Sequence, residues 1–329
     1  MPKINYPFKF VCTSDSQLQL SAPAMRRDAS FLDSIIAKFD YLFAHAERIG
    51  AQAVLHAGDL LNNPKVDPEV LTETMDLIDR WNIPLICTVG NHDCKHNMVG
   101  TYKKKSHLSV LEKHGVNVLI SGNSLEIHST ESKNPVVITG YGFNEPETMD
   151  LLDGMAIRKH DCFEIALVHA TIFGTKEIGG SKWIGAKNLK GPDVAYFGDV
   201  HDDPWADFHH KSGTRSFNLG ALARITKTEV NRKIKFLELH VNADDRVFQF
   251  YERDVPVAPG EQVFDIEKIE KIVVENAEQA LAAVARAKAS KGQDPVELAR
   301  HVGATLNEHN QRIYTPEQVT LLLKTLEVA

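Results

Sequence analysis

The sequence predicts an α/β fold, in which strands alternate with helices and pack in layers. Short apolar runs alternate with longer amphipathic segments through the first two thirds of the 329 residues. The apolar runs have the length of buried strands, and the amphipathic segments have the period of helices that cover a sheet. Several strands are followed directly by acidic, amide or imidazole residues. Because ligands of α/β proteins bind at the carboxyl ends of strands, we expect a functional site there.

The predicted elements follow one another in a regular order. Strands are expected at residues 8–13, 53–57, 84–89 and 116–120, with helices at 30–49, 67–81 and 106–114. Gly50 follows the first helix and is expected to end it, since glycine is the usual residue just past a helix. Further strands are expected at residues 135–140, 163–169, 194–197, 232–241 and 246–251. The last two predict a hairpin around the polar turn at 242–245.

The character of the sequence changes after residues 256–260, which contain two prolines and a glycine. Helices are expected at 266–289 and 295–307, and a third begins with Thr315 as N-cap and Pro316 at its first position. We therefore predict a first domain at residues 1–257 and a small helical C-terminal module at 258–329. Two interpretations of the module stay open: a lid on the first domain, or a docking element for a partner or a second copy.

Composition narrows the class of protein. The net charge of -7 and the 43% of hydrophobic residues are ordinary for a soluble globular chain. The four cysteines form no C-x-x-C pair, so we expect reduced thiols. We find neither a signal-peptide stretch nor an apolar run long enough to span a bilayer, and we expect a cytoplasmic protein without membrane contact. The acidic balance disfavours nucleic-acid binding by bulk charge, but bound metal ions would invert the local field of an acidic site.

Five short motifs at predicted strand ends carry residues that bind divalent cations. They are Asp-Ser-Gln at 15–17, Gly-Asp at 58–59, Gly-Asn-His-Asp at 90–93, Val-His at 168–169 and Gly-Asp-Val-His at 198–201. Each motif alone has ordinary explanations, such as a turn or a packed core histidine. Five of them in order, each after a strand, predict a metal centre.

The order and spacing of these motifs resemble the calcineurin-like metallophosphoesterases, whose motifs are D-x-H, G-D-x-x-D, G-N-H-D/E, a lone His and G-H-x-H. The resemblance implies a four-layered sandwich of two mixed sheets flanked by helices, and a hydrolase that uses two divalent metal ions. For the first metal it implies the ligands Asp15, Gln17, Asp59 and His201. For the second it implies Asp59, Asn91, His169 and Asp199, with Asp59 bridging both. It also implies that His92 is the general acid and that Asp93 orients it.

Two positions depart from the family pattern. Gln17 stands where a histidine is usual, and Asp199 stands where the first histidine of the last motif is usual. An amide oxygen and an additional carboxylate make the ligand set richer in oxygen, which favours hard cations. We therefore expect two Mn²⁺ ions, with Mg²⁺, Fe²⁺ or Zn²⁺ as alternatives. Two cations about 3.5–4 Å apart would clamp an in-line displacement at phosphorus.

Segments that flank the motifs resemble the SbcD-like branch of DNA double-strand-break repair nucleases, some of which are encoded by phages. The resembling segments are 15–18 with 27–28, 56–61, 111–116 and 218–224. This likeness implies a phosphodiesterase that cleaves DNA as an exonuclease or endonuclease in repair. It also implies an SMC-like ATPase as partner, beside the alternative of a homo-oligomer formed through the C-terminal helices.

For contacts with the DNA backbone we expect Arg224 and, on a loop after the Gly-Asn-His-Asp motif, Lys103, Lys104 and Lys105. Two rival functions stay open. One is a phosphoesterase that acts on small nucleotides or phosphomonoesters. The other is a scaffold that kept the fold and lost efficient metal binding through Gln17 and Asp199.

Overall fold

The computed structural model describes residues 5–23, 25–154, 162–170, 189–201, 207–226 and 229–267. The described residues up to Phe264 belong to one compact unit. The helices predicted after residue 267 lie outside the described residues, so the boundary between 257 and 258 stays a prediction. The described residues after that boundary include the short helix α6 (Gly260–Val263). Within the described part of the chain, no helix is both long and apolar enough to cross a membrane.

Two six-stranded sheets form the centre of this unit. The first has the order β12-β11-β1-β2-β3-β4. Its strands are β1 (Phe8–Thr13), β2 (Ala53–His56), β3 (Leu85–Cys87), β4 (Asn117–Val118), β11 (Lys235–Asn242) and β12 (Val247–Asp254). Strands β1 to β4 are parallel, and β11 and β12 add an antiparallel hairpin next to β1. The predicted hairpin is thereby confirmed.

The second sheet has the order β5-β6-β7-β8-β10-β9. Its strands are β5 (Asn123–Ile127), β6 (Val136–Tyr141), β7 (Phe163–His169), β8 (Val194–Gly198), β9 (Asp207–His209) and β10 (Arg215–Phe217). The four central strands are parallel, and the edge strands β5 and β9 are antiparallel to their neighbours. Both sheets are therefore mixed.

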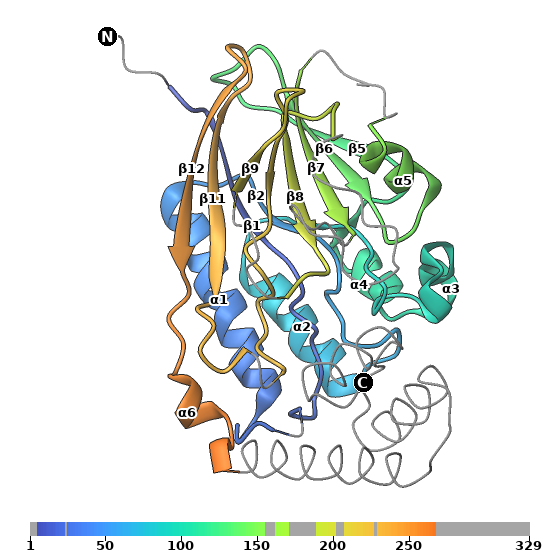
Figure 1. The fold of residues 1–329 in the computed structure, drawn as a ribbon, viewed down its shortest axis with the longest axis vertical. Coiled ribbons are helices and arrows are strands. Elements are labelled where there is room, and N and C mark those ends of the chain that lie inside the picture. The colour runs from blue at the N-terminus through green and yellow to red at the C-terminus, as the bar shows by residue number, and fades with distance from the viewer. Residues whose placement is uncertain are drawn as a thin grey trace, which may run out of the picture. The chain divides into compact units, whose positions relative to one another are not determined.

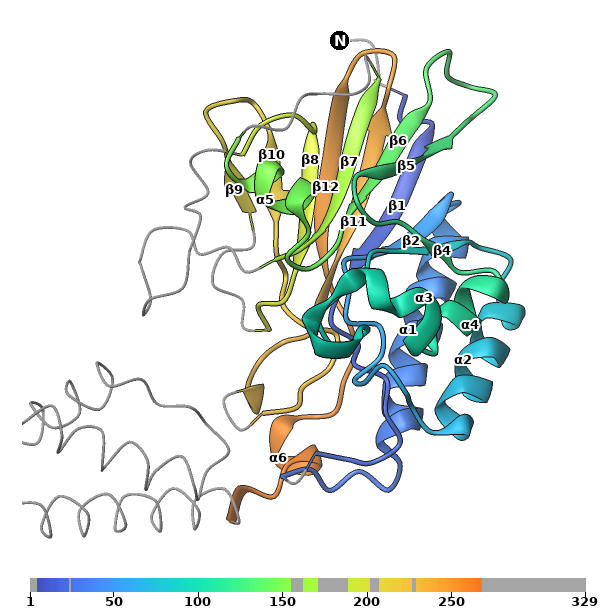
Figure 2. The ribbon, with the colours of Figure 1, turned by 90° about the vertical axis from the view of Figure 1, so that its right-hand side faces the viewer.

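Helices cover the outer face of each sheet, as Figures 1 and 2 show. The helices α1 (Phe31–Ile49), α2 (Pro68–Arg80) and α4 (Leu108–Lys113) share one hydrophobic core with the first sheet. A second core fills the space between the two sheets. A third core joins α5 (Pro146–Leu152) to the far face of the second sheet. The predicted α/β fold with two mixed sheets flanked by helices is confirmed.

The central strand β1 shows how the pattern of the sequence builds these layers. Side chains alternate across a strand, and Phe8, Phe10 and Cys12 lie in the core between the sheets, whereas Val11 packs under the helices. All of them are fully buried. The four cysteines are free thiols, as predicted.

Several elements were located from their end signals and several were missed. The Ser30 side chain accepts a hydrogen bond from the amide of Asp33 at the start of α1, and Gly50 ends the helix with a φ of 68°. Strands β5, β9 and β10 and helix α5 were not predicted. A further correction concerns Lys103, Lys104 and Lys105, which were expected on a loop and lie in the short helix α3 (Tyr102–Lys105).

Candidate metal centre

The predicted ligands converge because the strands that precede them end at the same edge of the two sheets. Asp15 follows β1, Asp59 follows β2 and Asn91 follows β3, all in the first sheet. His169 is the last residue of β7, and Asp199 follows β8, both in the second sheet. Backbone hydrogen bonds join the first two loops, from the amide of Asp15 to Gly58 and from that of Gln17 to Asp59. The site therefore lies where loops of both sheets meet.

The centre of the site consists of Asp15, Asp59 and His169. Each offers one ligand atom, and these three atoms lie within 4.8 Å of one another. The three side chains are buried, with at most 1% of their surface exposed. Two buried carboxylates this close together are costly unless a cation compensates them. The donor set and its burial therefore fit a divalent metal ion.

His169 connects the four residues predicted for the second metal. Its Nδ1 donates a hydrogen bond to the carbonyl of Ala57 at 2.7 Å, which leaves Nε2 facing the site. Nε2 lies 3.0 Å from Oδ1 of Asn91, 3.6 Å from Oδ1 of Asp59 and 3.8 Å from Oδ1 of Asp199. A backbone carbonyl on the far nitrogen is a common way to orient a metal-binding histidine. The structure thus brings these four residues together.

The residues predicted for the first metal also meet. Nε2 of His201 lies 3.8 Å from Oδ1 of Asp15 and 3.0 Å from the amide nitrogen of Gln17. Gln17 is 1% exposed, and its Oε1 has no hydrogen-bond partner among the described residues. Rotation of the amide exchanges its oxygen and nitrogen, so either can face His201. A buried amide oxygen without a donor beside an imidazole and a carboxylate fits a metal ligand.

The backbone of four predicted ligands has left-handed geometry. The φ angles are 50° at Asp15, 46° at Gln17, 55° at Asp59 and 91° at Asp199. Such a conformation costs a residue other than glycine about 1–3 kcal/mol and persists only where its surroundings hold it. The amide of Asp199 donates to the carboxylate of Asp15, at 3.1 Å to one oxygen and 3.2 Å to the other, and helps to hold this geometry. The strained loops aim the ligands at one point.

Two motif glycines are needed because the ligands approach the backbone closely. A Cβ atom at Gly58 would lie 2.4 Å from Nδ1 of His169, and one at Gly90 would lie 2.0 Å from Oδ1 of Asp59. Gly58 also has a φ of 87°, which suits glycine best. The glycines of the second and third motifs therefore make room for the ligands.

The electrostatics of the site also fit a cation. Burial raises the pKa of Asp15, and the neighbouring charge of Asp59 adds to that rise against the opposing effect of the histidines. Burial lowers the pKa of His169, but the carboxylates of Asp59, Asp15 and Asp199 outweigh it and raise the pKa to about 9. A proton on this imidazole compensates the carboxylates, and a bound divalent ion would take over that role.

His92 lies beside Asp59, and its orientation has another cause than expected. Its Nε2 lies 3.9 Å from Oδ2 of Asp59, and its Nδ1 donates to the backbone carbonyl of Asn62 at 2.8 Å. The expectation that Asp93 orients the ring is wrong. The buried carboxylate of Asp93 accepts instead from the backbone amides of Leu61 at 2.8 Å, Gly90 at 2.9 Å and Leu60 at 3.3 Å.

Asp93 therefore fastens the loop after β3 to the loop after β2. Burial and then the charge of Asp59 raise the pKa of Asp93 to about 7, against the effect of its backbone hydrogen bonds. Within the described residues, the Asp93 side chain forms no hydrogen bond with the His92 ring. Its role is to position the two loops that carry Asp59, Asn91 and His92.

The residues expected to bind a DNA backbone only partly suit that role. Arg224 is 4% exposed and donates to the carbonyls of Val230 at 3.1 Å and Ala258 at 2.6 Å, so it fastens the chain internally. Lys103 is exposed but its Nζ contacts Oε1 of Glu112 at 2.5 Å. Lys104 and Lys105 are exposed on α3 and form no such ion pair with the residues that the structure describes.

Sequence reasoning missed two neighbours of the site. The first is the carbonyl of Asn62, which no residue type could signal. The second is Glu229, whose Oε1 lies 4.0 Å from Nδ1 of His201. Glu229 is buried and accepts hydrogen bonds from the amides of Ile225 and Thr226. Glu229 lies outside the five motifs, on the C-terminal side of the last one, so the motif pattern does not point to it.

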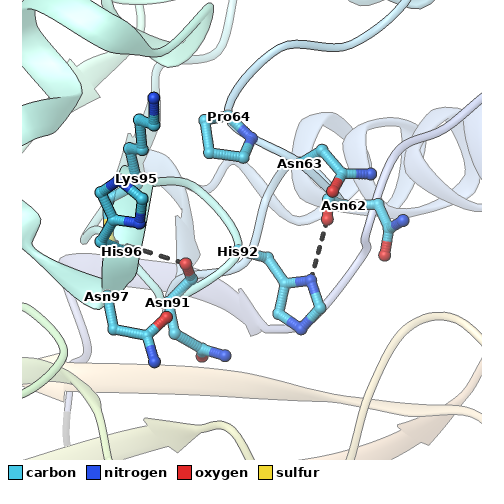
Figure 3. Close-up of a pocket in the computed structure, with 9 residues that line it drawn as sticks. Asn62, Asn63, Pro64, Asn91, His92, Lys95, His96 and Asn97 are labelled. Carbon is cyan, nitrogen blue, oxygen red and sulfur yellow. Dashed lines mark hydrogen bonds between the residues drawn. The ribbon is translucent and has the colours of Figure 1, made fainter. Parts of the chain in front are cut away.

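A cavity of about 310 Å³ opens beside His92. It is lined by Asn62, Asn63, Pro64, Asn91, His92, Cys94, Lys95, His96 and Asn97. Since His92 belongs to both the cavity and the surroundings of Asp59, the cavity adjoins the candidate metal centre (Figure 3).

Comparison with known proteins assigns the family. Similarity to two solved structures is low: a 5'-nucleotidase precursor from Thermus thermophilus is 12% identical, with a TM-score of 0.45. The match covers 84% of this chain and 59% of that one. NAD nucleotidase (NadN) from Haemophilus influenzae is 14% identical, with a TM-score of 0.41, and 75% and 49% of the two chains are covered. This chain thus spans about half to three fifths of those proteins.

No curated protein matches the chain. The family match does not distinguish branches of the family, and the SbcD-like branch and a phage origin stay predictions. The model of the family described as calcineurin-like phosphoesterase matches residues 8–203, which include all five motifs. The chain belongs to the calcineurin-like phosphoesterase family.

Proposed function

We propose that this protein hydrolyses phosphoesters with two divalent cations, held by the two groups of ligands that share Asp59. The observation that carries the proposal is the position of Asp59 between His169 and His92. One carboxylate oxygen lies 3.6 Å from Nε2 of His169, and the other lies 3.9 Å from Nε2 of His92. A metal ligand and a candidate acid therefore face the same buried carboxylate from two sides.

The bound cations would supply an activated water and neutralise the negative charge that develops on the phosphoryl group. The chain supplies the proton for the leaving group. Because Nδ1 of His92 donates to a carbonyl, its Nε2 is the nitrogen that faces the site. A doubly protonated His92 can pass the Nε2 proton to the leaving oxygen. The oxygen-rich ligands Gln17 and Asp199 favour Mn²⁺ or Mg²⁺ over Zn²⁺.

We propose a small nucleotide or another small phosphoester as the substrate. The cavity of about 310 Å³ beside His92 has the size of a site for one small organic group. Two of the four cationic side chains expected to contact a nucleic-acid backbone already have other contacts. Arg224 is buried, and Lys103 forms an ion pair with Glu112. These contacts support a small substrate better than a long anionic strand.

A DNA nuclease is the second candidate. Lys104 and Lys105 lie exposed on α3, shortly after the Gly-Asn-His-Asp motif. Two lysines in this position can contact a phosphate backbone without any base-specific reading. In that case a partner such as an SMC-like ATPase, or a second copy of the chain, would have to extend the surface that binds DNA.

The test is hydrolysis of bis-p-nitrophenyl phosphate, nucleoside 5'-monophosphates, and single- and double-stranded DNA, each with Mn²⁺, Mg²⁺, Fe²⁺ or Zn²⁺ and with EDTA. We expect metal-dependent turnover that Asp59→Asn abolishes together with most of the bound metal. Asp76→Asn, at a carboxylate on α2 away from the site, is the matched control and should leave both unchanged. Normal turnover and metal content in Asp59→Asn would refute the assignment. Cleavage of DNA alone would favour the nuclease.

A further inference from the structure

We propose that the cavity beside His92 is the subsite for the leaving group and that it binds a nucleobase. The inference rests on the proposed function, because the phosphoryl group has to lie at the metal centre for the leaving group to reach the cavity. His92 is the link, since it lines the cavity and faces Asp59. A leaving group protonated by His92 therefore departs on the side where the cavity opens.

The walls of the cavity come from two loops that the site itself positions. Figure 3 shows Lys95, His96 and Asn97 on one side of His92 and Asn62, Asn63 and Pro64 on the other. The first wall belongs to the turn after the Gly-Asn-His-Asp motif, and the second follows the Gly-Asp motif. Asp93 fastens these loops together through its backbone hydrogen bonds. The spacing between the walls is thus tied to the metal centre.

Three side chains of these walls are available to a ligand. Asn63, His96 and Asn97 line the cavity, and their side chains take part in no hydrogen bond within the described ranges. Each amide offers two donors and one acceptor oxygen. A pair of a donor and an acceptor on one amide matches the edge of a nucleobase, as in the pairing of asparagine with adenine.

The walls also offer flat surfaces for a planar ring. The imidazole of His96 and the ring of Pro64 both line the cavity (Figure 3). Histidine is among the side chains on which unstacked bases stack. A nucleobase uses both the flat surfaces and the amides, whereas a sugar or glycerol group would use the amides alone. This combination points to a nucleoside as the leaving group.

The conformation of the first wall supports a role in binding. His96 and Asn97 are consecutive residues with left-handed φ angles of 57° and 56°. The turn is held by Thr101, whose hydroxyl accepts from the amide of Lys95 at 3.0 Å and donates to the carbonyl of Met98 at 2.7 Å. Both residues line the cavity, and backbone strain of this kind clusters at ligand sites.

The chemistry of the step is balanced. The oxygen of water bonds to phosphorus, and the bond from phosphorus to the nucleoside oxygen breaks with its electron pair on that oxygen. The nucleoside oxygen takes the Nε2 proton of doubly protonated His92. The proton that the attacking water loses passes through solvent to Nε2 of His92, which becomes doubly protonated again. The products are a free nucleoside, or the shortened strand if the substrate is DNA, and the phosphoryl group with the added oxygen.

The experiment compares pairs of substrates that differ only in the base. Nucleoside 5'-monophosphates are compared with ribose 5-phosphate, and a dinucleotide with the same dinucleotide lacking its leaving base. We expect kcat/KM to be at least about tenfold higher with the base. Asn63→Ala, and Asn97→Gly, which keeps the left-handed backbone accessible, should each lower this ratio about 3- to 10-fold, the usual loss for one hydrogen bond. Asn123→Ala on the exposed edge strand β5 is the matched control.

The outcomes separate this inference from the proposed function. Turnover of bis-p-nitrophenyl phosphate with equal rates on both members of each pair would overturn the subsite and leave the phosphoesterase intact. If no substrate is hydrolysed, the proposed function fails. Titration of the metal-free protein with adenosine and ribose then shows whether the cavity binds a nucleobase. Binding of adenosine that Asn63→Ala weakens would support a nucleobase site in the cavity without a role in catalysis, and equal or absent binding of both compounds overturns the nucleobase site as well. Faster turnover of oligonucleotides than of mononucleotides would assign the base to a DNA strand.

Discussion

The backbone carbonyl of Asn62 accepts a hydrogen bond from Nδ1 of His92 at 2.8 Å and thereby decides which nitrogen of the ring faces Asp59. A carbonyl can only accept, so Nδ1 carries a proton in the neutral ring and Nε2 does not. His92 can consequently act as an acid only when both nitrogens are protonated.

His92→Ala should lower kcat by about two to four orders of magnitude and leave the metal content unchanged. The expected loss is that of a general acid that is not a metal ligand. Turnover measured beside metal content by mass spectrometry checks both parts, and His128→Ala, an exposed histidine after β5, is the control. A loss of metal equal to that in Asp59→Asn would make His92 a ligand and contradict its role as the acid.

Gln17→His and Asp199→His together should move the metal preference from Mn²⁺ towards Zn²⁺. The double variant exchanges two oxygen ligands for imidazole nitrogens and removes one negative charge. Both positions already face the site, Gln17 beside His201 and Asp199 beside His169. Activity and binding across a series of metal ions provide the measurement. An unchanged profile would show that neither side chain reaches a metal.

Lys38 should make the stability of the protein rise with pH above neutrality. It is buried on α1 and its Nζ has no hydrogen-bond partner in the described part of the chain. Burial and then the charges of Arg26, Arg224 and Arg232 lower its pKa from 10.5 to about 7. Between these values the unfolded chain holds the proton and the folded chain does not, so stability increases with pH. The penalty is complete below about pH 7 and fades as the pH rises.

Lys38→Met should therefore be more stable than the natural protein near pH 7, and the difference should shrink by up to about 1.4 kcal/mol for each pH unit above it. Urea unfolding of both proteins at about pH 7, 8 and 9 gives the comparison, in which all other titrating groups cancel. A difference that does not change with pH would mean that Lys38 stays charged or finds a partner.

Arg224→Ala should destabilise the fold rather than weaken DNA binding selectively. It leaves the carbonyls of Val230 and Ala258 without their donor, at about 1–3 kcal/mol for each buried group. Replacement of Lys104 and Lys105 by alanine should leave the melting temperature unchanged. If DNA is the substrate, this change should also reduce the salt dependence of binding by about one phosphate contact for each lysine. Thermal unfolding and DNA titration at several salt concentrations distinguish the two effects.

Periodicity and one end signal were sufficient for the long helices. Gly50 was the expected end of α1, and the helix expected at 67–81 corresponds to α2. Strand β7 was predicted with its observed bounds because its residues are mostly apolar or β-forming, and the structure buries all of them. The convergence of the ligands followed from the rule that parallel strands end at one edge of a sheet.

The rest depended on contacts between distant residues. Strands β9 and β10 have three residues each and alternate too briefly to be recognised, since they are strands only through their pairing with each other and with β8. Strand β5 is a largely exposed edge strand whose polar residues give no apolar period. The orientation of His92 was missed for another reason. Every residue has a carbonyl, so a contact made by the backbone of Asn62 leaves no trace in the sequence.

The two sheets each contribute to the metal centre, with Asp15 and Asp59 from the first and His169 and His201 from the second. A cation held by both groups would tie the two layers together, in addition to their apolar packing and to hydrogen bonds such as that from Nδ1 of His169 to the carbonyl of Ala57. Because a ligand that binds only the folded state stabilises it, metal would strengthen the cohesion between the layers. The ligands become neighbours only after the sheets have docked. Tight metal capture would therefore be one of the last events of folding, and a measure of whether a given molecule has completed it.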